Sequence, residues 1–373
     1  MPVTSVVGVD LGGTNVRAAV FSSRGERLSP VSSRPSHAEL GANETLAAVA
    51  ESVEECTKGR KAGRIGLAIP GHADDVAGVV RWSPNFGVRK DGVLHYWKNV
   101  QVRKPLERMT GLPVTLANDA NAAAIGEYRF GTGNGNASCL VMLTLGTGIG
   151  GGVVLSPKSV QGKASGPLVL VGGNMGGAEL GHVMVQRGGL DSSAGIYGTL
   201  EAYCQRDAII ARAQHKLVRG RTSLLNDVAE GDLGRLTPEH ITRAANRGDE
   251  VAQEVWREIG GYLGAAVGSL INVFAPDVFA IGGQISGAGK WLFEPQGGSP
   301  ERRCAIAVQG LPHPQGQARL RRRDDRGRRG RIGGEMNKEL SFERTEVEIE
   351  GGRTLYLYTF EEESLEAGDD DPA

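Results

Sequence analysis

The sequence predicts an α/β protein of two domains, each built on a mixed sheet with helices on its faces. An apolar strand, a Gly-Thr turn and a second apolar strand occur together twice, at residues 6–21 and again at residues 141–154. Strand-like and helix-like segments alternate between the two copies, which is typical of a layered α/β fold. The chain has 373 residues and is 40% hydrophobic, which is enough for two hydrophobic cores.

The elements that follow the first copy are predicted from apolar spacing. Residues 44–56 carry apolar side chains at helical spacing, and residues 64–69 form a short apolar run that ends at a Pro-Gly pair. Residues 112–116 predict another strand, which leads into Asn118 and Asp119. The pattern therefore predicts a helix and two strands in this region.

The clearest helix is expected over residues 249–274. Six apolar residues share one stripe, namely Val251, Val255, Ile259, Leu263, Val267 and Leu270. Four glycines, Gly260, Gly261, Gly264 and Gly268, are expected to let another backbone pack closely against this helix. Pro276 ends the helix, and residues 278–281 predict a strand that leads to Gly282 and Gly283.

The two Gly-Thr turns are candidate sites for the phosphates of a nucleotide held between two lobes. Glycine has no Cβ atom, so backbone N–H groups can approach an anionic oxygen and the chain can adopt a positive φ. The candidates are Gly12, Gly13, Thr14 and Asn15 in the first turn and Gly146, Thr147 and Gly148 in the second. The alternative is an ordinary glycine-rich hairpin, but its repetition within one chain favours phosphate binding. The glycine spacing matches neither a Walker loop nor a Rossmann fingerprint.

Two carboxylates complete the expected chemistry of phosphoryl transfer. Asp10 ends the first strand, where a Mg²⁺ carried by a nucleotide needs an oxygen ligand. Asp119 follows a predicted strand and can accept the proton of an attacking hydroxyl, while the neighbouring amide of Asn118 orients the alcohol. The alternative is that Asn118 and Asp119 only cap the helix that follows them.

Composition favours a cytoplasmic enzyme. The formal net charge of -1 gives no reason to expect nucleic acid or a membrane as partner. No apolar run reaches membrane-spanning length, and the first strand is expected so close to Met1 that no signal peptide precedes it. The four cysteines, Cys56, Cys139, Cys204 and Cys304, are widely separated and show neither metal nor disulfide spacing.

Several motifs occur in an order that resembles sugar kinases and regulators of the ROK family, within the actin, hexokinase and heat-shock-70 superfamily. The resemblance runs from about Ser5 to Pro295. Its motifs lie at residues 10–14, 117–122, 126–131, 145–148, 178–182, 198–201 and 281–283. Within the family the chain is most similar to bacterial glucokinases.

The resemblance implies a two-domain, actin-like ATPase fold of the ribonuclease-H type with a duplicated mixed sheet. The smaller domain is expected over residues 1–117, and the larger domain, with the sugar and adenosine motifs, over residues 118–295. The activity implied is phosphorylation of a hexose, in the first place D-glucose, to the 6-phosphate, with ATP and Mg²⁺ and with Asp119 as general base.

The resemblance also assigns residues to the substrates. The implied hexose-binding residues are Asn85, Asn118, Asp119, Glu179, His182 and Glu201, and Gly282 and Gly283 are expected beside the adenosine. A sugar ring needs several such partners, because each hydroxyl buried without a hydrogen bond costs free energy. Taken alone, Glu179 and His182 also fit an ordinary pair on a helix surface, and Pro84-Asn85 also fits a turn.

The chain departs from the family at a zinc-binding motif. Many ROK proteins hold a structural zinc with three cysteines and a histidine. The three cysteine positions correspond here to Ser192, Ala194 and Thr199, and only His182 remains. We therefore predict no zinc, with His182 orienting the sugar while its other ring nitrogen finds a protein or water partner. One stoichiometric zinc found by elemental analysis would contradict this prediction.

The C-terminal part of the sequence departs as well. Residues 296–335 are rich in Arg, Gly and Pro and predict irregular chain, whereas residues 336–373 alternate apolar and polar residues and end in an acidic run. A family member is expected to finish with a helix that returns to the first domain. Our hypothesis is that the residues after about 295 are a shifted reading frame of GC-rich DNA. The alternative is a genuine basic tail that binds polyanions.

Other readings of the function stay open. The chain could be a sugar-sensing regulator, although that reading calls for a DNA-binding domain ahead of Ser5, or a catalytically impaired sugar-binding protein. The hexose could instead be fructose, mannose or an N-acetylated hexosamine, because pocket shape decides this, and the phosphate donor could be polyphosphate. Relatives commonly form homodimers or homotetramers, and the motifs do not choose between these assemblies.

Overall fold

A computed structural model describes residues 5–90, 93–162, 164–192, 194–230 and 232–293, together with five strands that follow. The chain divides into two compact units. The first comprises Met1–Gly135, Gly152–Val154 and Gly166–Glu179, and the second comprises Asn136–Gly151, Leu155–Ser165 and Leu180–Ala373. The first unit thus extends beyond residue 117.

The first unit is built on a five-stranded mixed sheet with the order β3-β2-β1-β4-β8. Its strands are β1 (Ser5–Leu11), β2 (Asn15–Ser22), β3 (Ser32–Pro35), β4 (Ile65–Ile69) and β8 (Val114–Asn118). Strand β1 pairs antiparallel with β2 and parallel with β4, and β4 pairs parallel with β8. The predicted first hairpin and the two predicted strands after it are confirmed.

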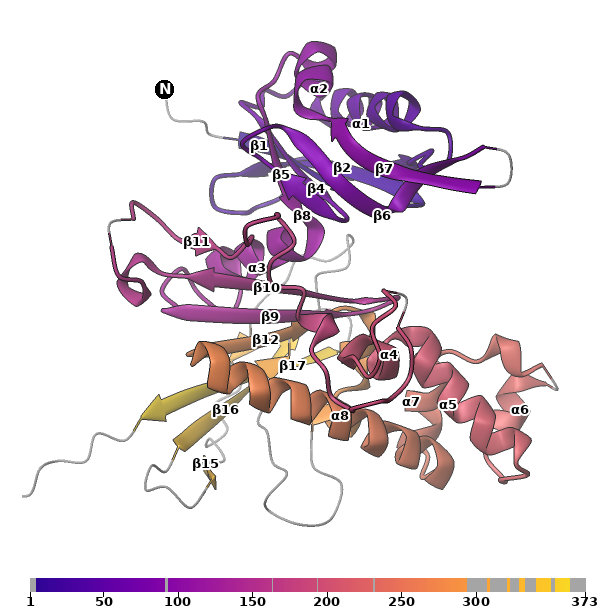
Figure 1. Cartoon of the computed structure of the whole chain (residues 1–373). Coiled ribbons are helices and arrows are strands. Elements are labelled where there is room, and N and C mark those ends of the chain that lie inside the picture. Colours follow the sequence, from indigo (N-terminus) through magenta and orange to yellow (C-terminus); the bar gives the residue numbers. More distant parts are fainter. Residues whose placement is uncertain are drawn as a thin grey trace, which may run out of the picture. The chain divides into compact units, whose positions relative to one another are not determined.

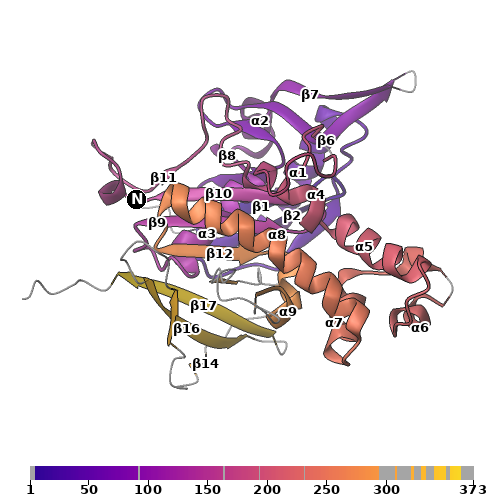
Figure 2. The ribbon, with the colours of Figure 1, turned by 60° about the horizontal axis from the view of Figure 1, so that its bottom comes forward.

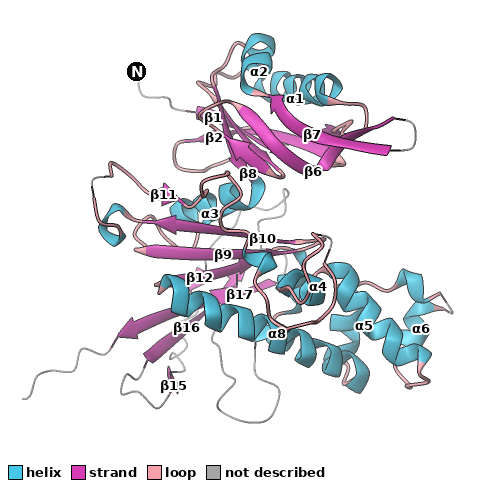
Figure 3. Ribbon diagram, viewed as in Figure 1, coloured by secondary structure: helices cyan, strands magenta, loops and turns pink. Residues whose placement is uncertain are grey.

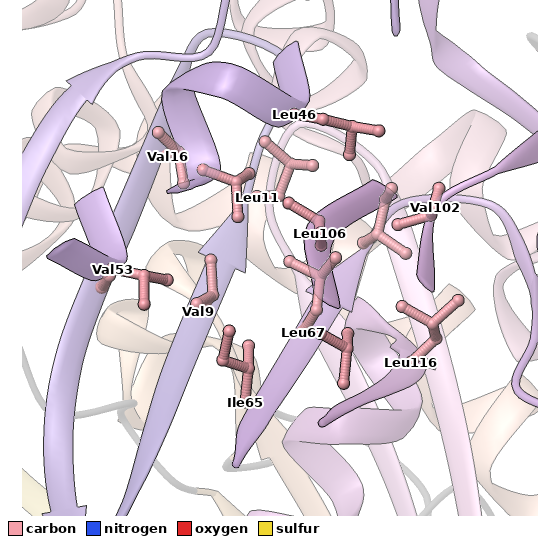
Figure 4. Packing of buried hydrophobic residues seen from close by; sticks show 14 of the residues in the cluster. Val9, Leu11, Val16, Leu46, Val53, Ile65, Leu67, Val102, Leu106 and Leu116 are labelled. Atoms are coloured by element: carbon pink, nitrogen blue, oxygen red, sulfur yellow. The ribbon is translucent and has the colours of Figure 1, made fainter. Parts of the chain in front are cut away.

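Helices α1 (Ala42–Thr57) and α2 (Arg103–Thr110) lie on the same side of this sheet (Figure 1). Side chains from α1, β1 and β4 meet in the core, among them Leu46, Leu11 and Leu67 (Figure 4). Each of these leucines is at most 2% exposed, so each burial contributes about 1.5–3 kcal/mol to folding. The helix predicted over residues 44–56 is confirmed.

The first unit also contains an antiparallel sheet of β5 (His72–Asp74), β6 (Val79–Lys90) and β7 (Val93–Gln101). The pairing of β6 with β7 shifts between Ser83 and Gly87. Pro84 lies in this irregular stretch, where a residue without a backbone N–H is tolerated within a strand. The sequence patterns did not predict this sheet, and Pro84-Asn85 lies within β6 and not in a turn. Helix α3 (Asp119–Phe130) and the short strand β11 (Leu168–Val169) belong to the same unit.

The second unit repeats the arrangement of the first. Strands β9 (Cys139–Leu145) and β10 (Ile149–Leu155) flank the second Gly-Thr turn, and β12 (Val278–Gly282) pairs parallel with β9 as β4 does with β1. The sheet that contains these strands has the order β11-β10-β9-β12-β13-β17-β16-β14, in which β11 and residues Gly152–Val154 of β10 are assigned to the first unit. A hairpin beside a parallel strand therefore occurs twice, which confirms the predicted duplicated mixed sheet.

The second unit also holds most of the helices (Figure 3). They are α4 (Leu200–Cys204), α5 (Arg206–Val218), α6 (Leu225–Ala229), α7 (Pro238–Asn246), α8 (Glu250–Phe274) and α9 (Lys290–Phe293), with 3₁₀ turns η1 (Pro157–Ser159), η2 (Leu180–His182), η3 (Leu233–Arg235) and η4 (Gln284–Ala288). Helices α5, α6 and α7 gather beside the end at which α8 begins (Figure 2).

Helix α8 confirms the predicted long helix, because all six residues of the predicted stripe are buried. Asp249 caps it by accepting a hydrogen bond from the backbone N of Ala252. Close backbone packing occurs at Gly260, where a Cβ atom would lie 3.2 Å from the Leu292 carbonyl oxygen. The Cβ positions of the other three glycines meet no described atom within 4 Å, so close packing among the described residues is confirmed at Gly260 alone. No helix among the described residues is both long and apolar enough to cross a bilayer.

Five strands follow residue 293. They are β13 (Ala307–Val308), β14 (Arg321–Arg322), β15 (Arg329–Ile332), β16 (Leu340–Ile349) and β17 (Arg353–Glu362). Strands β16 and β17 form an antiparallel hairpin, to which β14 and β15 pair through β16. Short strands thus occur within residues 296–335, where composition predicts irregular chain, because β12, β16 and β17 supply pairing partners. The acidic run at residues 369–371 and Cys304 lie outside the described residues.

Candidate active site

Two of the predicted carboxylates lie at one edge of the first sheet. Strands β1, β4 and β8 are parallel neighbours, so their carboxyl ends meet at the same edge. Asp10 is level with Ala68 on β4, which is level with Ala117 on β8. Asp119 begins α3 directly beyond β8. Because neighbouring strands are about 4.8 Å apart, this topology places Asp10 and Asp119 two strands from each other.

Both polar ends of the Asn118 side chain are engaged in the fold. Its Oδ1 accepts a hydrogen bond from the backbone N of Asn121 at 3.1 Å, which caps helix α3. Its Nδ2 donates to the carbonyl oxygen of Gly71 at 3.0 Å. The capping alternative is therefore observed for Asn118, whose side chain also forms a hydrogen bond that lowers the pKa of Asp119.

The carboxyl of Asp119 has a raised pKa. Partial desolvation raises the pKa of its carboxyl, and the negative charge of Asp10 raises this pKa further. A hydrogen bond from the backbone N of Ala120 to Oδ1, 2.8 Å long, acts in the opposite direction. The side chain nevertheless reaches solvent, so desolvation is incomplete and the carboxylate is accessible to a substrate hydroxyl.

Asp10 is the more open of the two carboxylates, with 62% of its side chain exposed and Arg17 4.0 Å away. The turn beside it is closed by a hydrogen bond from the Gly12 backbone N to the Asn15 carbonyl oxygen, 2.9 Å long. Thr14 and Asn15 are exposed to solvent. This turn can therefore present a carboxylate, a hydroxyl and an amide to a ligand.

The glycines of the two turns do not adopt positive φ. None of Gly12, Gly13, Gly146 and Gly148 is in that region, so the expectation of left-handed backbone in the turns is wrong. Close approach explains the glycine at two of these positions. A Cβ atom would lie 3.3 Å from the Asn15 carbonyl oxygen at Gly12 and 2.8 Å from Glu201 Oε2 at Gly148.

His72 is a further candidate site residue, which the sequence reasoning did not propose. It follows Gly71, whose carbonyl oxygen bonds to Asn118, and its ring meets Trp82 edge-on at 5.6 Å between centroids. Its Nε2 lies 3.9 Å from Oε1 of Glu179. His72 comes three residues after the end of strand β4, so the rule that ligands bind beyond the carboxyl ends of parallel strands could have found it.

The second Gly-Thr turn and the Gly-Gly pair lie at one edge of the second sheet. Strand β9 leads to Gly146, and the parallel strand β12 leads to Gly283. Gly283 has φ +91°, and its Cβ position would lie only 2.2 Å from the Leu145 carbonyl oxygen. Glycine is required here because both its φ and this close contact exclude a side chain.

Glu201 lies against the second turn. Glu201 is a residue of α4 and is only 8% exposed. Its Oε2 accepts a hydrogen bond from the backbone N of Ile149 at 2.8 Å. His182 ends η2, which packs so tightly on the start of β10 that a Cβ atom on Gly181 would lie 2.1 Å from the Ile149 carbonyl oxygen. Among the described residues, Nδ1 of His182 is buried with no hydrogen-bond partner.

The remaining predicted hexose residues are Asn85 and Glu179. Asn85 lies in β6, and its side chain is outside the described part of the structure. Glu179 belongs to the first unit, together with Asn118 and Asp119, whereas His182 and Glu201 belong to the second.

The segment that carries a zinc motif in relatives is held by hydrogen bonds here. Ser192 Oγ accepts from the backbone N of Ala194 and of Ile196, and Thr199 Oγ1 accepts from the backbone N of Ala202 to cap α4. Within the described residues, no group of three or more His, Cys, Asp or Glu side chains is arranged to hold a metal ion.

Comparison with known proteins identifies related chains. The sequence profile of the ROK family matches residues 6–308. A glucokinase from Thermotoga maritima is 37% identical over 295 residues, which are 79% of this chain and 86% of the relative. The DNA-binding transcriptional repressor Mlc from Escherichia coli is 28% identical and is matched over 61% of this chain and 50% of the repressor.

A solved structure shares the fold. The crystal structure of a ROK family glucokinase from Streptomyces griseus, in complex with glucose and AMPPNP, superposes with a TM-score of 0.65 at 30% identity. The superposition covers 82% of this chain and 94% of that chain.

Proposed function

The chain belongs to the ROK family and has its actin-like ATPase fold, and on that premise we propose that it is a hexose kinase that phosphorylates D-glucose at the 6-hydroxyl with ATP. The glucokinases of Thermotoga maritima and Streptomyces griseus support this choice of substrate. The observation that carries the proposal is the solvent-accessible Asp119 carboxylate at the edge where the parallel strands β1, β4 and β8 end, with Asp10 at the same edge.

Asp119 is the proposed general base. It accepts the proton of the 6-hydroxyl as that oxygen forms a bond to the γ-phosphorus and the bond from phosphorus to the ADP oxygen breaks. A base of this kind contributes about 10²–10⁴ in rate. Asn118 fixes the position of Asp119, because it caps the same helix, bonds to Gly71 and forms a side-chain hydrogen bond to Asp119, and its amide is proposed to help orient the alcohol.

The proposed nucleotide site comprises the two Gly-Thr turns, the carboxylate of Asp10 near the end of β1, and the glycine pair Gly282-Gly283 at the end of β12. Backbone N–H groups of the first and second turns receive phosphate oxygens, and Gly282 and Gly283 lie beside the adenosine. The exposed carboxylate of Asp10 next to a compact turn fits a Mg²⁺-bound nucleotide. Bound Mg²⁺ supplies charge neutralisation on the phosphates.

The proposed hexose contacts are Asn85, Asn118, Asp119, Glu179, His182 and Glu201. Nδ1 of His182 is buried and has no hydrogen-bond partner in the described part of the chain, which supports a ligand or solvent hydrogen bond there, since a buried nitrogen without a partner costs free energy. His72, beside Glu179 and Trp82, joins this set as a further wall of the hexose site.

A coupled assay of ADP release over a panel of hexoses tests the proposal. Glucose, mannose, fructose and N-acetylglucosamine are each offered with ATP and Mg²⁺, and polyphosphate replaces ATP in a parallel series. We expect turnover with glucose and ATP at the highest kcat/KM. Turnover confined to another hexose or to polyphosphate would correct the substrate, and no turnover with any pair would contradict kinase activity.

A sugar-binding regulator is the second candidate, favoured by the 28% identity to the repressor Mlc. Binding calorimetry with the same hexoses separates the two functions. Hexose binding without any ADP release would support a regulator or an impaired kinase, whereas binding accompanied by turnover supports the kinase.

A further inference from the structure

Strand β8 lies at the edge of the first sheet and leads directly to the proposed base. Strand β4 pairs with one side of β8, and in the sheet order no described strand pairs with its other side. An open strand edge presents backbone N–H and C=O groups that need partners. Asp119 begins α3 where β8 ends, so the position of this strand sets the position of Asp119.

Side chains supply partners for this edge. Asp75 Oδ1 accepts a hydrogen bond from the backbone N of Leu116 at 2.7 Å. Arg103 Nε donates to the Val114 carbonyl oxygen at 2.9 Å, and Glu107 Oε1 accepts from the backbone N of Val114 at 3.1 Å. These three side chains take the place that a neighbouring strand would fill.

Asp75 and Arg103 also hold each other. Arg103 Nη2 donates to Oδ1 of Asp75 in an ion pair, and the Arg103 side chain is only 26% exposed. The backbone N of Arg103 donates to the Gly78 carbonyl oxygen at 3.1 Å, and the backbone N of Gly78 donates to the Asp74 carbonyl oxygen at 2.9 Å. The turn over residues 74–78 and the start of α2 are therefore bonded to each other, which fixes the Asp75 carboxylate.

Strand β5 is bonded to β8 from both of its ends. Gly71 precedes β5 and Asp75 follows it. The Gly71 carbonyl oxygen accepts from Asn118 Nδ2 at 3.0 Å, while Asp75 accepts from Leu116. Strand β8 is thus held at residues 116 and 118, and Asp119 is the next residue along the chain.

We propose that Asp75 is a positioning residue for the transfer of the phosphoryl group, because its bond to Leu116 keeps the end of β8, and with it Asp119, in line with the hexose hydroxyl. This inference rests on the proposed function, since it takes Asp119 as the base. A reacting group displaced by about 1 Å can lose about 10²-fold in rate. The effect of Asp75 is therefore expected on the rate of transfer, and much less on glucose affinity, to which several other residues contribute.

Single-turnover phosphorylation of glucose with Mg²⁺-ATP, together with calorimetric glucose binding, tests the proposal in wild type, Asp75→Ala and Asp75→Asn. Asp75→Ala removes the acceptor for the Leu116 N–H, and we expect the rate constant to fall about 10-fold while the glucose Kd stays within about 2-fold of wild type. Asp75→Asn keeps an acceptor oxygen for this N–H, and we expect its rate constant to lie within about 3-fold of wild type.

Arg81→Ala is the matched control. Arg81 forms an ion pair with Asp74, the neighbour of Asp75, at 2.6 Å between Nη2 and Oδ2. Its hydrogen bonds among the described residues run to Asp74 and Asn99, and not to β8. We expect Arg81→Ala to lower the free energy of unfolding while its single-turnover rate constant stays at the wild-type value.

Denaturant unfolding of every variant ensures that rates are compared between folded proteins. If Asp75→Ala does not fold, Arg103→Lys replaces it. Lysine keeps the charge but lacks the two separate nitrogens that reach Asp75 and the Val114 carbonyl oxygen, so the same fall in rate is expected.

A wild-type rate constant in folded Asp75→Ala, or in its Arg103→Lys replacement, would overturn the inference. An equal fall in Arg81→Ala, a rate in Asp75→Asn as low as in Asp75→Ala, or a loss of glucose affinity as large as the loss of rate would overturn it as well. The hexose panel on wild type judges the proposed function separately, so an active wild type with an unaffected Asp75→Ala rejects this inference alone. A wild type without turnover on any hexose would reject both.

Discussion

Asn118 shows how one side chain can serve the fold and the site together. Its oxygen caps α3, and its nitrogen donates a hydrogen bond to Gly71, the residue before His72. The cap fixes where α3 begins and hence where Asp119 lies. The motif was predicted to act either as a cap or as a catalytic pair; the structure shows Asn118 as the cap, while the side chain of Asp119 reaches solvent.

Asn118→Ala is expected to lower the free energy of unfolding by about 1–2 kcal/mol, because a helix cap and a hydrogen bond to Gly71 are both lost. Asn118→Ser keeps a capping oxygen but is too short for Gly71, so it should recover part of the loss. Chemical denaturation of the three proteins measures this. An alanine variant as stable as wild type would mean that neither bond contributes.

The titrations of Asp10 and Asp119, at the edge of the first sheet, are expected to be coupled. The negative charge of Asp10 raises the pKa of Asp119, so the neutral Asp10→Asn variant lowers the pKa of the base. Because the proposed base must be ionised, the acid limb of the kcat/KM profile should move to lower pH, even though loss of the proposed magnesium ligand is also expected to reduce the rate. Glu26→Gln, which removes a surface carboxylate after β2, is the matched control. An acid limb that stays in place in Asp10→Asn would show that Asp119 does not govern it.

At the scale of elements, the hairpins and the long helix could be predicted, because a local pattern of apolar residues specifies each of them. The two hairpins follow from apolar strands around glycine turns, and α8 follows from a continuous apolar stripe. The β5-β6-β7 sheet was not predicted, because Pro84 interrupts the strand pattern of β6 and is accommodated only by its irregular pairing with β7.

The candidate site residues divide in the same way. Asp10 lies near the end of the apolar strand β1 and Asp119 directly follows the strand β8, so the strand pattern pointed to both as candidates. His72 was not proposed from the sequence, because the residues it meets, Trp82 and Glu179, are distant in sequence. The bond from Ile149 to Glu201 likewise joins positions 52 residues apart, and no spacing rule connects them.

Gly283, which directly follows β12, allows a test of how tightly the chain after β12 packs against the end of β9. Gly283→Ala places a Cβ 2.2 Å from the Leu145 carbonyl oxygen at a φ of +91°, and we expect a loss of about 3 kcal/mol in unfolding free energy. Gly287→Ala is the matched control, because its Cβ position meets no described atom within 4 Å. Thermal and denaturant unfolding measure both, and equal stability of the two variants would contradict the tight β9-β12 contact.

At the scale of the whole molecule, two units carry the same hairpin and parallel strand, and the family match covers residues 6–308. The sequence beyond residue 295 remains the least family-like part of the chain. Its Arg-rich and Gly-rich composition provides little apolar surface for a core.

The reading-frame hypothesis predicts the mass of the native protein. If the residues after about 295 are a shifted frame, intact mass spectrometry of protein isolated from its native cell should give a value different from the 39.3 kDa of these 373 residues. Resequencing of the locus should then restore a family-like C-terminus. A mass that matches all 373 residues would contradict the hypothesis and favour a genuine basic tail.

The central claim is that Asp119 deprotonates a hexose hydroxyl, and single-turnover phosphorylation of glucose in wild type and Asp119→Ala tests it most directly. We expect the rate constant to fall by about 10²–10⁴, while glucose affinity measured by calorimetry changes far less, because a base acts on the transition state more than on binding. An Asp119→Ala variant that phosphorylates glucose as fast as wild type would contradict the claim.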